Sequence, residues 1–145
     1  MSDMERALRF YRDVLGLSEQ RNMVLEGDLV SQLTGFENAR VHVVYLGNDM
    51  RHAVELVQFL EPPVVEGAAP ARNRVGTAHL GIIVDDVDAF YEDLSERGME
   101  FVNPPALRPD AVYPWARKVC YLYDPDGNLL ELIERDAAPP GATVV

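Results

Sequence analysis

Three residues of types that bind metal ions lie in apolar segments of the sequence. His79, Glu131 and Glu55 each have an apolar neighbour on both sides. A carboxylate in apolar surroundings is costly unless it is paired, protonated or bound to a metal ion. Imidazole and carboxylate groups together suit a divalent transition ion such as zinc, iron, manganese or nickel. A site of this kind with open positions binds a chelating substrate and polarises its oxygen atoms.

Taken singly, each of these residues has a simpler explanation. Side chains alternate in direction along a strand, so a glutamate between leucines can face solvent from a half-covered sheet. A single histidine in an apolar segment is more often a packed core residue than a ligand. The metal-site hypothesis therefore depends on whether the three residues take equivalent places in the fold.

An internal repeat gives the two glutamates equivalent places. Apolar residues at helical spacing predict one helix over residues 4–15 and a second over residues 87–94, and a glycine follows each. Ser2 with Glu5, and Asp85 with Asp88, predict where the two helices begin. The strand-like runs that follow are residues 41–46, 53–60, 118–123 and 128–133. Glu55 and Glu131 thus occupy the last strand of each half.

The two halves differ at their beginnings. A buried strand over residues 78–84 contains His79 and precedes the second helix, whereas only Met1 precedes the first. When Ser2 is aligned with Asp85, the counterpart of His79 would lie five residues upstream of Met1. The repeat predicts a first module (αβββ) over residues 1–62, a linker over 63–75, a second module (βαβββ) over 76–135 and a flexible tail over 136–145.

Composition limits the partners and the compartment. The chain has 145 residues, a net charge of −11 and a single cysteine, Cys120. A protein this acidic is repelled by nucleic acid and by anionic lipid, so we expect neither nucleic acid nor membrane as a partner. No apolar run approaches the roughly 20 residues of a membrane-spanning helix. No signal peptide is visible, so we expect a cytoplasmic protein in which Cys120 is a packed thiol.

The repeat resembles the paired βαβββ modules of the vicinal-oxygen-chelate superfamily, the glyoxalase/bleomycin resistance protein/dioxygenase family. Three segments carry the resemblance: residues 2–17, 79–87 and 124–132. It implies an α+β fold in which two βαβββ modules, the first lacking its opening strand, form a curled mixed sheet around a metal and substrate cleft. A sheet without its opening strand exposes an edge, and exposed edges pair readily, so we expect a homodimer.

The resemblance also implies a ligand set and a cofactor. In metal-dependent members the ligands come from the first and last strands of each module, which here names His79, Glu131 and Glu55. Glu131 and Glu55 would also be the catalytic bases. The implied cofactor is a divalent ion: Zn, Ni, Fe, Mn or Co. The remaining ligand, usually histidine, belongs on the absent opening strand, and without it this chain would bind a metal less completely or not at all.

The resemblance favours a metal-dependent enzyme, a glyoxalase-like lyase or isomerase or an epimerase, that moves a proton on a small carbonyl or acyl thioester compound. Extradiol ring-cleavage dioxygenases are one alternative. They share Tyr121 and the turn after it, but residues 110–120 contain no histidine, which their pattern requires. A metal-free drug- or metabolite-binding protein of the bleomycin-resistance kind is the other. The side chains that we expect to contact a small-molecule substrate are Trp115, Arg117, His42 and Phe59.

Overall fold

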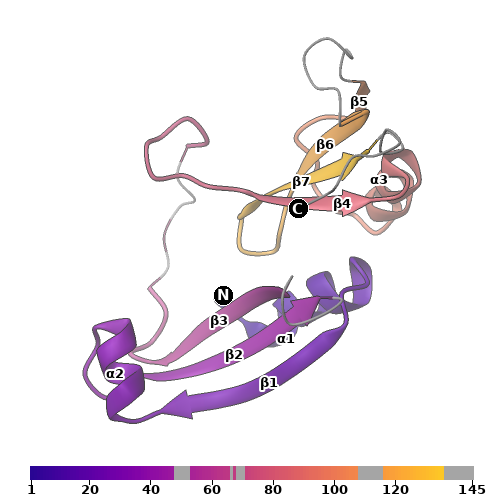
Figure 1. Cartoon of the computed structure of the whole chain (residues 1–145). Helices are drawn as coiled ribbons and strands as arrows, with labels where there is room; N and C mark the ends of the chain where they lie inside the picture. The colour runs from indigo at the N-terminus through magenta and orange to yellow at the C-terminus, as the bar shows by residue number, and fades with distance from the viewer. Residues whose placement is uncertain (48–52, 66, 68–70, 108–115, 136–145) are drawn as a thin grey trace, which may run out of the picture. The chain divides into compact units, whose positions relative to one another are not determined.

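The computed structural model of the chain describes residues 1–47, 53–65, 67, 71–107 and 116–135. It has an α+β fold with two β-sheets, as the sequence predicted, and divides into two compact units, Met1–Ala69 and Pro70–Val145 (Figure 1). The elements of the first unit are α1 (Met4–Leu8), the π-helix η1 (Arg9–Val14), β1 (Glu19–Glu26), α2 (Asp28–Thr34), β2 (Arg40–Gly47) and β3 (Ala53–Glu61). Those of the second are β4 (Leu80–Val84), α3 (Val87–Glu96), β5 (Ala106–Leu107), β6 (Lys118–Tyr123) and β7 (Leu129–Glu134).

The first sheet has the strand order β1-β2-β3 and is antiparallel throughout. Successive side chains of β2 point to opposite faces of the sheet. Val44 and Leu46 are fully buried on the face that α1 covers. On the other face Val30 of α2 packs against Val41 and Val43. Each face of this sheet therefore has its own apolar cluster.

The two helices that repeat, α1 and α3, begin at Met4 and Val87 as the sequence predicted, but their N-cap residues lie one position later than predicted. The N-cap of α1 is Asp3, whose carboxylate accepts from the backbone N–H of Arg6 at 2.9 Å, so the predicted pair of Ser2 and Glu5 does not cap this helix. Asp86 takes the same place at α3. Both aspartates have the extended backbone of an N-cap, and their short side chains reach the third amide of the helix. The correction is the same in both halves, so the repeat alignment is unchanged.

The segment between the first helix and β2 forms two elements that the sequence did not locate. The side chains of β1 are mostly exposed and do not alternate in burial, so pairing with β2 and not a local pattern defines this strand. In α2 the side chains of Leu29 and Leu33 are exposed. The helices within the described residues are short, and none has both the length and the apolar character needed to cross a bilayer.

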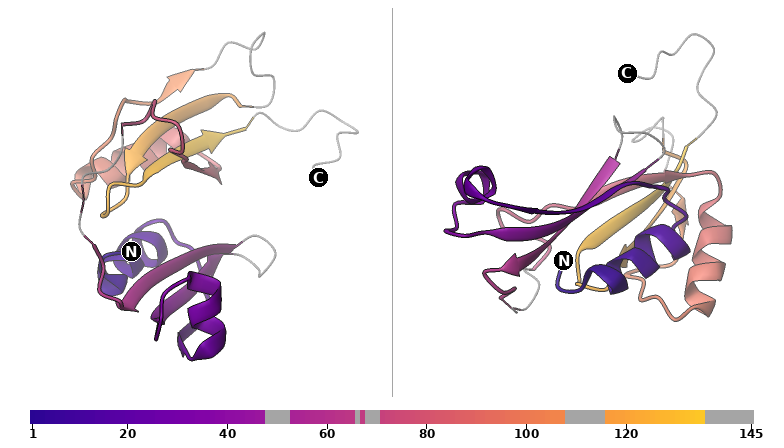
Figure 2. Two further views of the ribbon diagram at one scale, coloured as in Figure 1. Left: turned by 90° about the vertical axis from the view of Figure 1, so that its left-hand side faces the viewer. Right: turned by 90° about the horizontal axis from the view of Figure 1, so that it is seen from below.

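The second sheet is mixed, with the strand order β4-β7-β6-β5. β4 runs parallel to β7, whereas β6 is antiparallel to both of its neighbours, β7 and β5. One face packs against α3 and buries the core of this unit (Figure 2). The core side chains contributed by the two central strands are Cys120, Leu122, Leu130 and Leu132. The opposite face of the same strands carries the polar residues described below.

A carboxylate at the turn between β6 and β7 holds these strands in register. Asp124 is buried, and its Oδ1 accepts from the backbone N–H groups of Asp126 at 2.9 Å and Asn128 at 2.7 Å. Gly127 has φ +81°, a left-handed conformation that favours glycine. This turn sets the pairing of the two strands, and so determines which residues of β6 and β7 share a face.

Cys120 lies in the core beneath α3, and burial raises the pKa of its thiol to about 11, with a smaller contribution from the carboxylate of Asp88. An ordinary cysteine thiol has a pKa of 9.0, so this rise leaves about 100-fold less thiolate in the folded chain at pH 8. We therefore expect a thiol-specific disulfide reagent to label the native protein at least about 100-fold more slowly than the same protein in urea. Because the folded pKa is raised, folding stability should decline as pH rises from about 9 to about 11. Equal labelling rates in the two conditions would contradict this placement.

Candidate functional site

The face of the second sheet opposite α3 brings together His79, Tyr121 and Glu131. Glu131 on β7 is directly opposite Tyr121 on β6, and the side chains of such a pair share a face. His79 immediately precedes β4, and its Nε2 lies 3.3 Å from Oε2 of Glu131. The rings of His79 and Tyr121 meet edge to face with centroids 5.7 Å apart. Parallel pairing of β4 with β7 thus unites two of the predicted ligands, which are 52 residues apart in the chain.

The two members of this pair differ in exposure. Glu131 is only 7% exposed, whereas the side chain of His79 is 45% exposed. A buried carboxylate is stabilised by a cation beside it, because burial removes the water that would otherwise solvate the charge. Either a protonated imidazole or a metal ion held by His79 and Glu131 meets that requirement. The arrangement therefore fits two ligands of a divalent ion that is approached from the solvent side.

A glycine lies beside Glu131 on the neighbouring strand. Gly81 of β4 is the register partner of Glu131. A Cβ atom at Gly81 would lie 3.2 Å from Cδ1 of Ile133, closer than an ordinary van der Waals contact. The register partner of Glu131 on β4 therefore adds no side chain, and His79 is the neighbour of the carboxylate on that side.

In the first unit Glu55 has a phenol as its partner. Glu55 on β3 is exposed and lies directly opposite Tyr45 on β2. The Tyr45 hydroxyl donates to Oε1 of Glu55 at 2.7 Å. This hydrogen bond, together with burial and the charge of the carboxylate, raises the pKa of Tyr45. Val57 and Phe59 follow Glu55 on the same face of β3, so the carboxylate lies at one end of an apolar surface.

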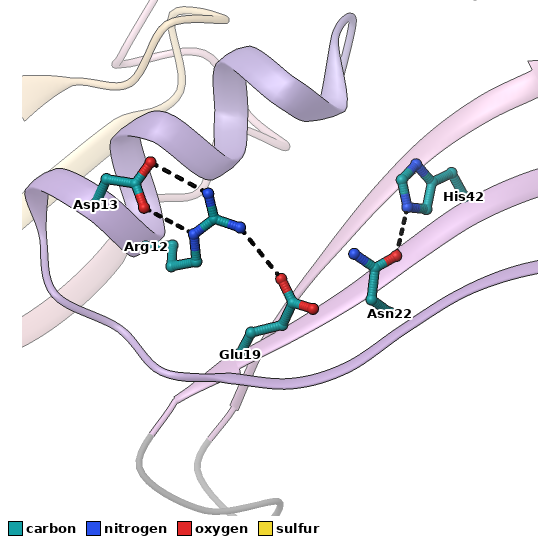
Figure 3. A network of polar contacts seen from close by, with 5 residues as sticks. All are labelled: Arg12, Asp13, Glu19, Asn22 and His42. Atoms are coloured by element: carbon teal, nitrogen blue, oxygen red, sulfur yellow. Dashed lines mark hydrogen bonds and ion pairs between the residues drawn. The ribbon is translucent and has the colours of Figure 1, made fainter.

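His42 lies on the other face of the first sheet. It is three positions from Tyr45 on β2, and alternation therefore directs it away from the face that carries Glu55 and Phe59. Its Nε2 lies 2.7 Å from Oδ1 of Asn22 on β1 (Figure 3). The substrate contact predicted for His42 stays a prediction, and it would have to be made on the face opposite Glu55 and Phe59.

An exposed ion-pair network joins η1 to the start of β1. Nε of Arg12 lies 2.7 Å from Asp13, and its Nη1 lies 3.4 Å from Glu19 (Figure 3). The hydrogen bond from Arg12 lowers the pKa of Asp13. Exposed pairs of this kind add little to stability, and we assign the network no part in the site.

Arg117 is engaged in an ion pair on the helix side of the second sheet. Its Nη1 lies 2.9 Å from Oε1 of Glu134, a buried residue whose Oε2 accepts from the backbone N–H of Val87 at 3.0 Å. Glu134 is three positions from Glu131 on β7, so the two carboxylates point to opposite faces. The guanidinium predicted to contact substrate thus balances a carboxylate that also binds the first turn of α3. Trp115, the other residue predicted in this segment, lies outside the described residues.

The metal-site prediction is met in part by the geometry. Within the described ranges no group of three or more His, Cys, Asp or Glu side chains is arranged to hold a metal ion. The second unit brings His79 and Glu131 together, and the first unit holds Glu55 with Tyr45.

The sequence prediction missed the role of tyrosine in both units. Tyr45 precedes Glu55 by the same number of positions as Tyr121 precedes Glu131. Each tyrosine is the direct cross-strand partner of its glutamate. That repeated spacing is visible in the sequence and is the signal that marks the pair.

Comparison with known proteins identifies the superfamily of the chain. The sequence pattern of the Glyoxalase/Bleomycin resistance protein/Dioxygenase superfamily matches residues 1–132. The chain belongs to this superfamily. A relative, the uncharacterised protein YraH of Bacillus subtilis (strain 168), is 30% identical over 132 residues, which cover 91% of this chain and 90% of that protein.

Several solved structures share the fold of this chain. A glyoxalase family protein from Bacillus cereus has a TM-score of 0.79 and 24% identity, and the match covers 94% of this chain and 89% of that one. TnmS3, an antibiotic-binding protein from Streptomyces sp. CB03234, has a TM-score of 0.58 and 24% identity, with the same coverage of 94% and 89%. The superfamily fold therefore occurs in proteins with different described roles, and the residues of the site must decide between them.

We expect substitution of Arg117 by alanine to act on stability. Loss of the guanidinium leaves the buried Glu134 carboxylate without its ion-pair partner, which should lower the free energy of unfolding by about 1 kcal/mol, because the arginine itself is partly exposed to water. Urea denaturation followed by circular dichroism measures the change. Arg72→Ala, at an exposed position, is the matched control. Unchanged stability of Arg117→Ala would return Arg117 to the set of possible substrate contacts.

Proposed function

We propose that this protein is a metal-dependent enzyme of the glyoxalase and epimerase kind, which transfers a proton on a small carbonyl or acyl thioester compound. The observation that carries the proposal is the approach of His79 Nε2 to Glu131 Oε2, at 3.3 Å, on the face of the second sheet opposite α3. Within this superfamily, an exposed imidazole over a buried carboxylate is a donor pair suited to Zn, Ni, Fe, Mn or Co.

His79 is proposed as a ligand only, and Glu131 as a ligand that also accepts a proton. The strand positions of Glu131 and Tyr121 hold the carboxylate in place, and a fixed carboxylate is a better base than a mobile one because less reorganisation is needed. Glu55, at the equivalent position of the first module, is the further ligand and base that the repeat supplies. Such an ion, when bound, would polarise the oxygen atoms of a chelating substrate.

The proton transfer itself requires only groups of this chain. A glutamate carboxylate removes the proton from the carbon next to the substrate carbonyl, and the electron pair of the C–H bond moves onto the carbonyl oxygen. The same carboxylic acid, or the second glutamate, then returns the proton to a neighbouring carbon or to the other face of the same carbon. The first outcome is an isomerisation and the second an epimerisation, and neither consumes another reactant.

Phe59 is the side chain that we propose for contact with an apolar part of the substrate. It lies four positions beyond Glu55 on the same face, at about 13 Å along the strand. Its ring meets that of Phe36 edge to face, with centroids 5.6 Å apart, and Phe36 is 49% exposed. Trp115 stays in the proposal on the sequence argument alone.

Cobalt binding tests the proposal directly. In equilibrium dialysis against Co²⁺ we expect each wild-type chain to bind about one ion, because its two modules together supply one pair of imidazole and carboxylate ligands. His79→Ala and Glu131→Gln should each weaken Co²⁺ binding by at least about tenfold, since loss of a group that only orients a metal ligand already costs that much affinity. His42→Ala and Glu92→Gln are matched controls. His42→Ala removes a histidine from the first sheet, and Glu92→Gln removes the charge of an exposed glutamate of α3.

Failure of the wild-type chain to bind Co²⁺ would exclude the metal-dependent reaction. The metal-free alternative, a protein that binds a drug or metabolite, would then be the better proposal. The edge-to-face pair of Phe36 and Phe59 favours it, because exposed aromatic rings on a sheet offer a surface for an apolar ligand. Tight Co²⁺ binding that both His79→Ala and Glu131→Gln leave unchanged would place the metal elsewhere in the chain.

We also propose that the protein is a homodimer. β1 and β3 are edge strands of the three-stranded sheet, and edges with free backbone groups pair readily. Light scattering coupled to size-exclusion chromatography should give twice the chain mass of 16.2 kDa. A mass equal to one chain across the accessible concentration range would exclude the dimer.

A further inference from the structure

Gly81 occupies the position of β4 that is paired with Glu131 in the second sheet. Together with Tyr121 of β6, these two residues form one row across three neighbouring strands. We propose that Gly81 is a specificity-determining residue, which leaves room for a flat group of the substrate to lie against the sheet beside the carboxylate. This inference rests on the proposed function, because it takes the substrate to bind at His79 and Glu131.

The backbone of β4 gives no reason for a glycine at this position. Gly81 does not have the positive φ that favours glycine elsewhere in the chain, and the pairing of β4 with β7 is regular from Leu80 to Val84. Glycine inside a strand lowers stability, because it loses more conformational freedom on folding than any other residue. A strand glycine without a bulge or a bend often marks a place where a ligand or another backbone segment approaches closely.

The described residues around Gly81 distinguish these two causes. Among them, and apart from its own chain neighbours, the one atom that a Cβ at Gly81 would approach within 4 Å is Cδ1 of Ile133, at 3.2 Å. This atom ends a flexible side chain and is not a backbone segment. Gly81 is also exposed. The approach of a ligand is therefore the cause that the second unit supports.

The space above Gly81 adjoins both proposed ligands. Paired residues of neighbouring strands lie about 5 Å apart, so Gly81 is the position of β4 next to the backbone of Glu131. His79 lies two positions earlier, and its Nε2 is 3.3 Å from Oε2 of Glu131. On the β6 side the ring of Tyr121 meets that of His79 edge to face. A substrate group that reaches the imidazole and the carboxylate from the β4 side therefore passes over Gly81.

The absence of a side chain at position 81 determines which groups fit beside Glu131. A methyl group there would project from the sheet on the same face as the carboxylate. It would occupy the volume in which a planar group with two oxygen atoms lies against the strand, and overlap of this kind is unfavourable. A small linear anion can approach from solvent without contacting the strand. The glycine therefore predicts selectivity by shape, which two simple ligands can measure.

A role of Gly81 in packing predicts a different result. If Gly81 made room for a backbone segment, a methyl group would force that segment away and lower the stability of the chain. If it makes room for a ligand, alanine should leave the metal-free chain at least as stable, because alanine restricts the unfolded chain more than glycine does. Ile133→Val removes the Cδ1 atom that the new Cβ would meet, so we place Gly81→Ala in that background.

The experiment compares the wild-type full-length chain, Ile133→Val and the double variant Gly81→Ala/Ile133→Val, each loaded with Co²⁺. Acetohydroxamate, a flat ligand with two oxygen donors, and azide, a small linear anion, are titrated into each, and the visible absorption of Co²⁺ reports binding. We expect the added methyl group to weaken acetohydroxamate binding by at least about tenfold and to leave Co²⁺ affinity and azide binding unchanged. In EDTA, urea denaturation should show the double variant to be at least as stable as Ile133→Val. Gly67→Ala is the matched control, because Gly67 is exposed and a Cβ there would meet no atom of the described residues within 4 Å.

The outcomes separate this inference from the proposed function. Equal acetohydroxamate affinity of Ile133→Val and the double variant would overturn the role of Gly81 and leave the metal site intact. Lower stability of the double variant in EDTA, up to failure to fold, would also overturn it, because the glycine would then serve packing. Loss of Co²⁺ or azide binding together with acetohydroxamate would overturn it as well, because the methyl group would then disturb the ligands and not the space beside them. No Co²⁺ uptake by the wild-type chain would overturn both the metal site and the role of Gly81.

Discussion

Coverage of each sheet by a helix is the constraint on which the rest of the structure depends. A strand under a helix must direct its apolar side chains to that helix, and alternation then places the intervening residues on the other face. In β7 the leucines at positions 130 and 132 are buried beneath α3, so Glu131 between them faces the other way. A one-residue slip of β7 would bury Glu131 under the helix and expose both leucines. Burial of the two leucines under α3 therefore keeps Glu131 on the opposite face of the sheet, beside His79.

β7 carries two buried carboxylates that have different partners. Glu134 faces α3, accepts from the amide of Val87 and pairs with Arg117, so protein groups balance its charge. Glu131 faces the side opposite α3 and lies next to a histidine that is nearly half exposed. Protonation of His79, or a metal bound there, changes the charge beside Glu131. For this reason the first carboxylate stabilises the helix, and the second is suited to chemistry.

Membership of the superfamily leaves the reaction open for a physical reason. The fold provides two sheets, and side chains on the faces that carry Glu55 and Glu131 determine whether a metal, an aromatic ligand or both are bound. In this chain the second unit presents nitrogen and oxygen donors, whereas the first presents a carboxylate next to an aromatic surface made by Phe59 and Phe36. An enzyme of the glyoxalase kind uses the donors, and a binding protein uses the aromatic surface. The same fold can therefore serve an enzyme or a binding protein, and a few residues on these faces decide which.

The sequence alone determined the repeat, the α+β class and the equivalence of Glu55 with Glu131, because hydrophobic periodicity and turn residues are local properties. It did not determine β1, whose side chains are mostly exposed, or the true N-caps, where adjacent acidic and hydroxyl residues compete for the same role. Only the tertiary structure decided that His79 meets Glu131, that Arg117 pairs with Glu134, and that His42 faces away from Glu55. Strand register and non-local pairing set these contacts, and no local pattern of residues encodes which face of a strand a helix will cover.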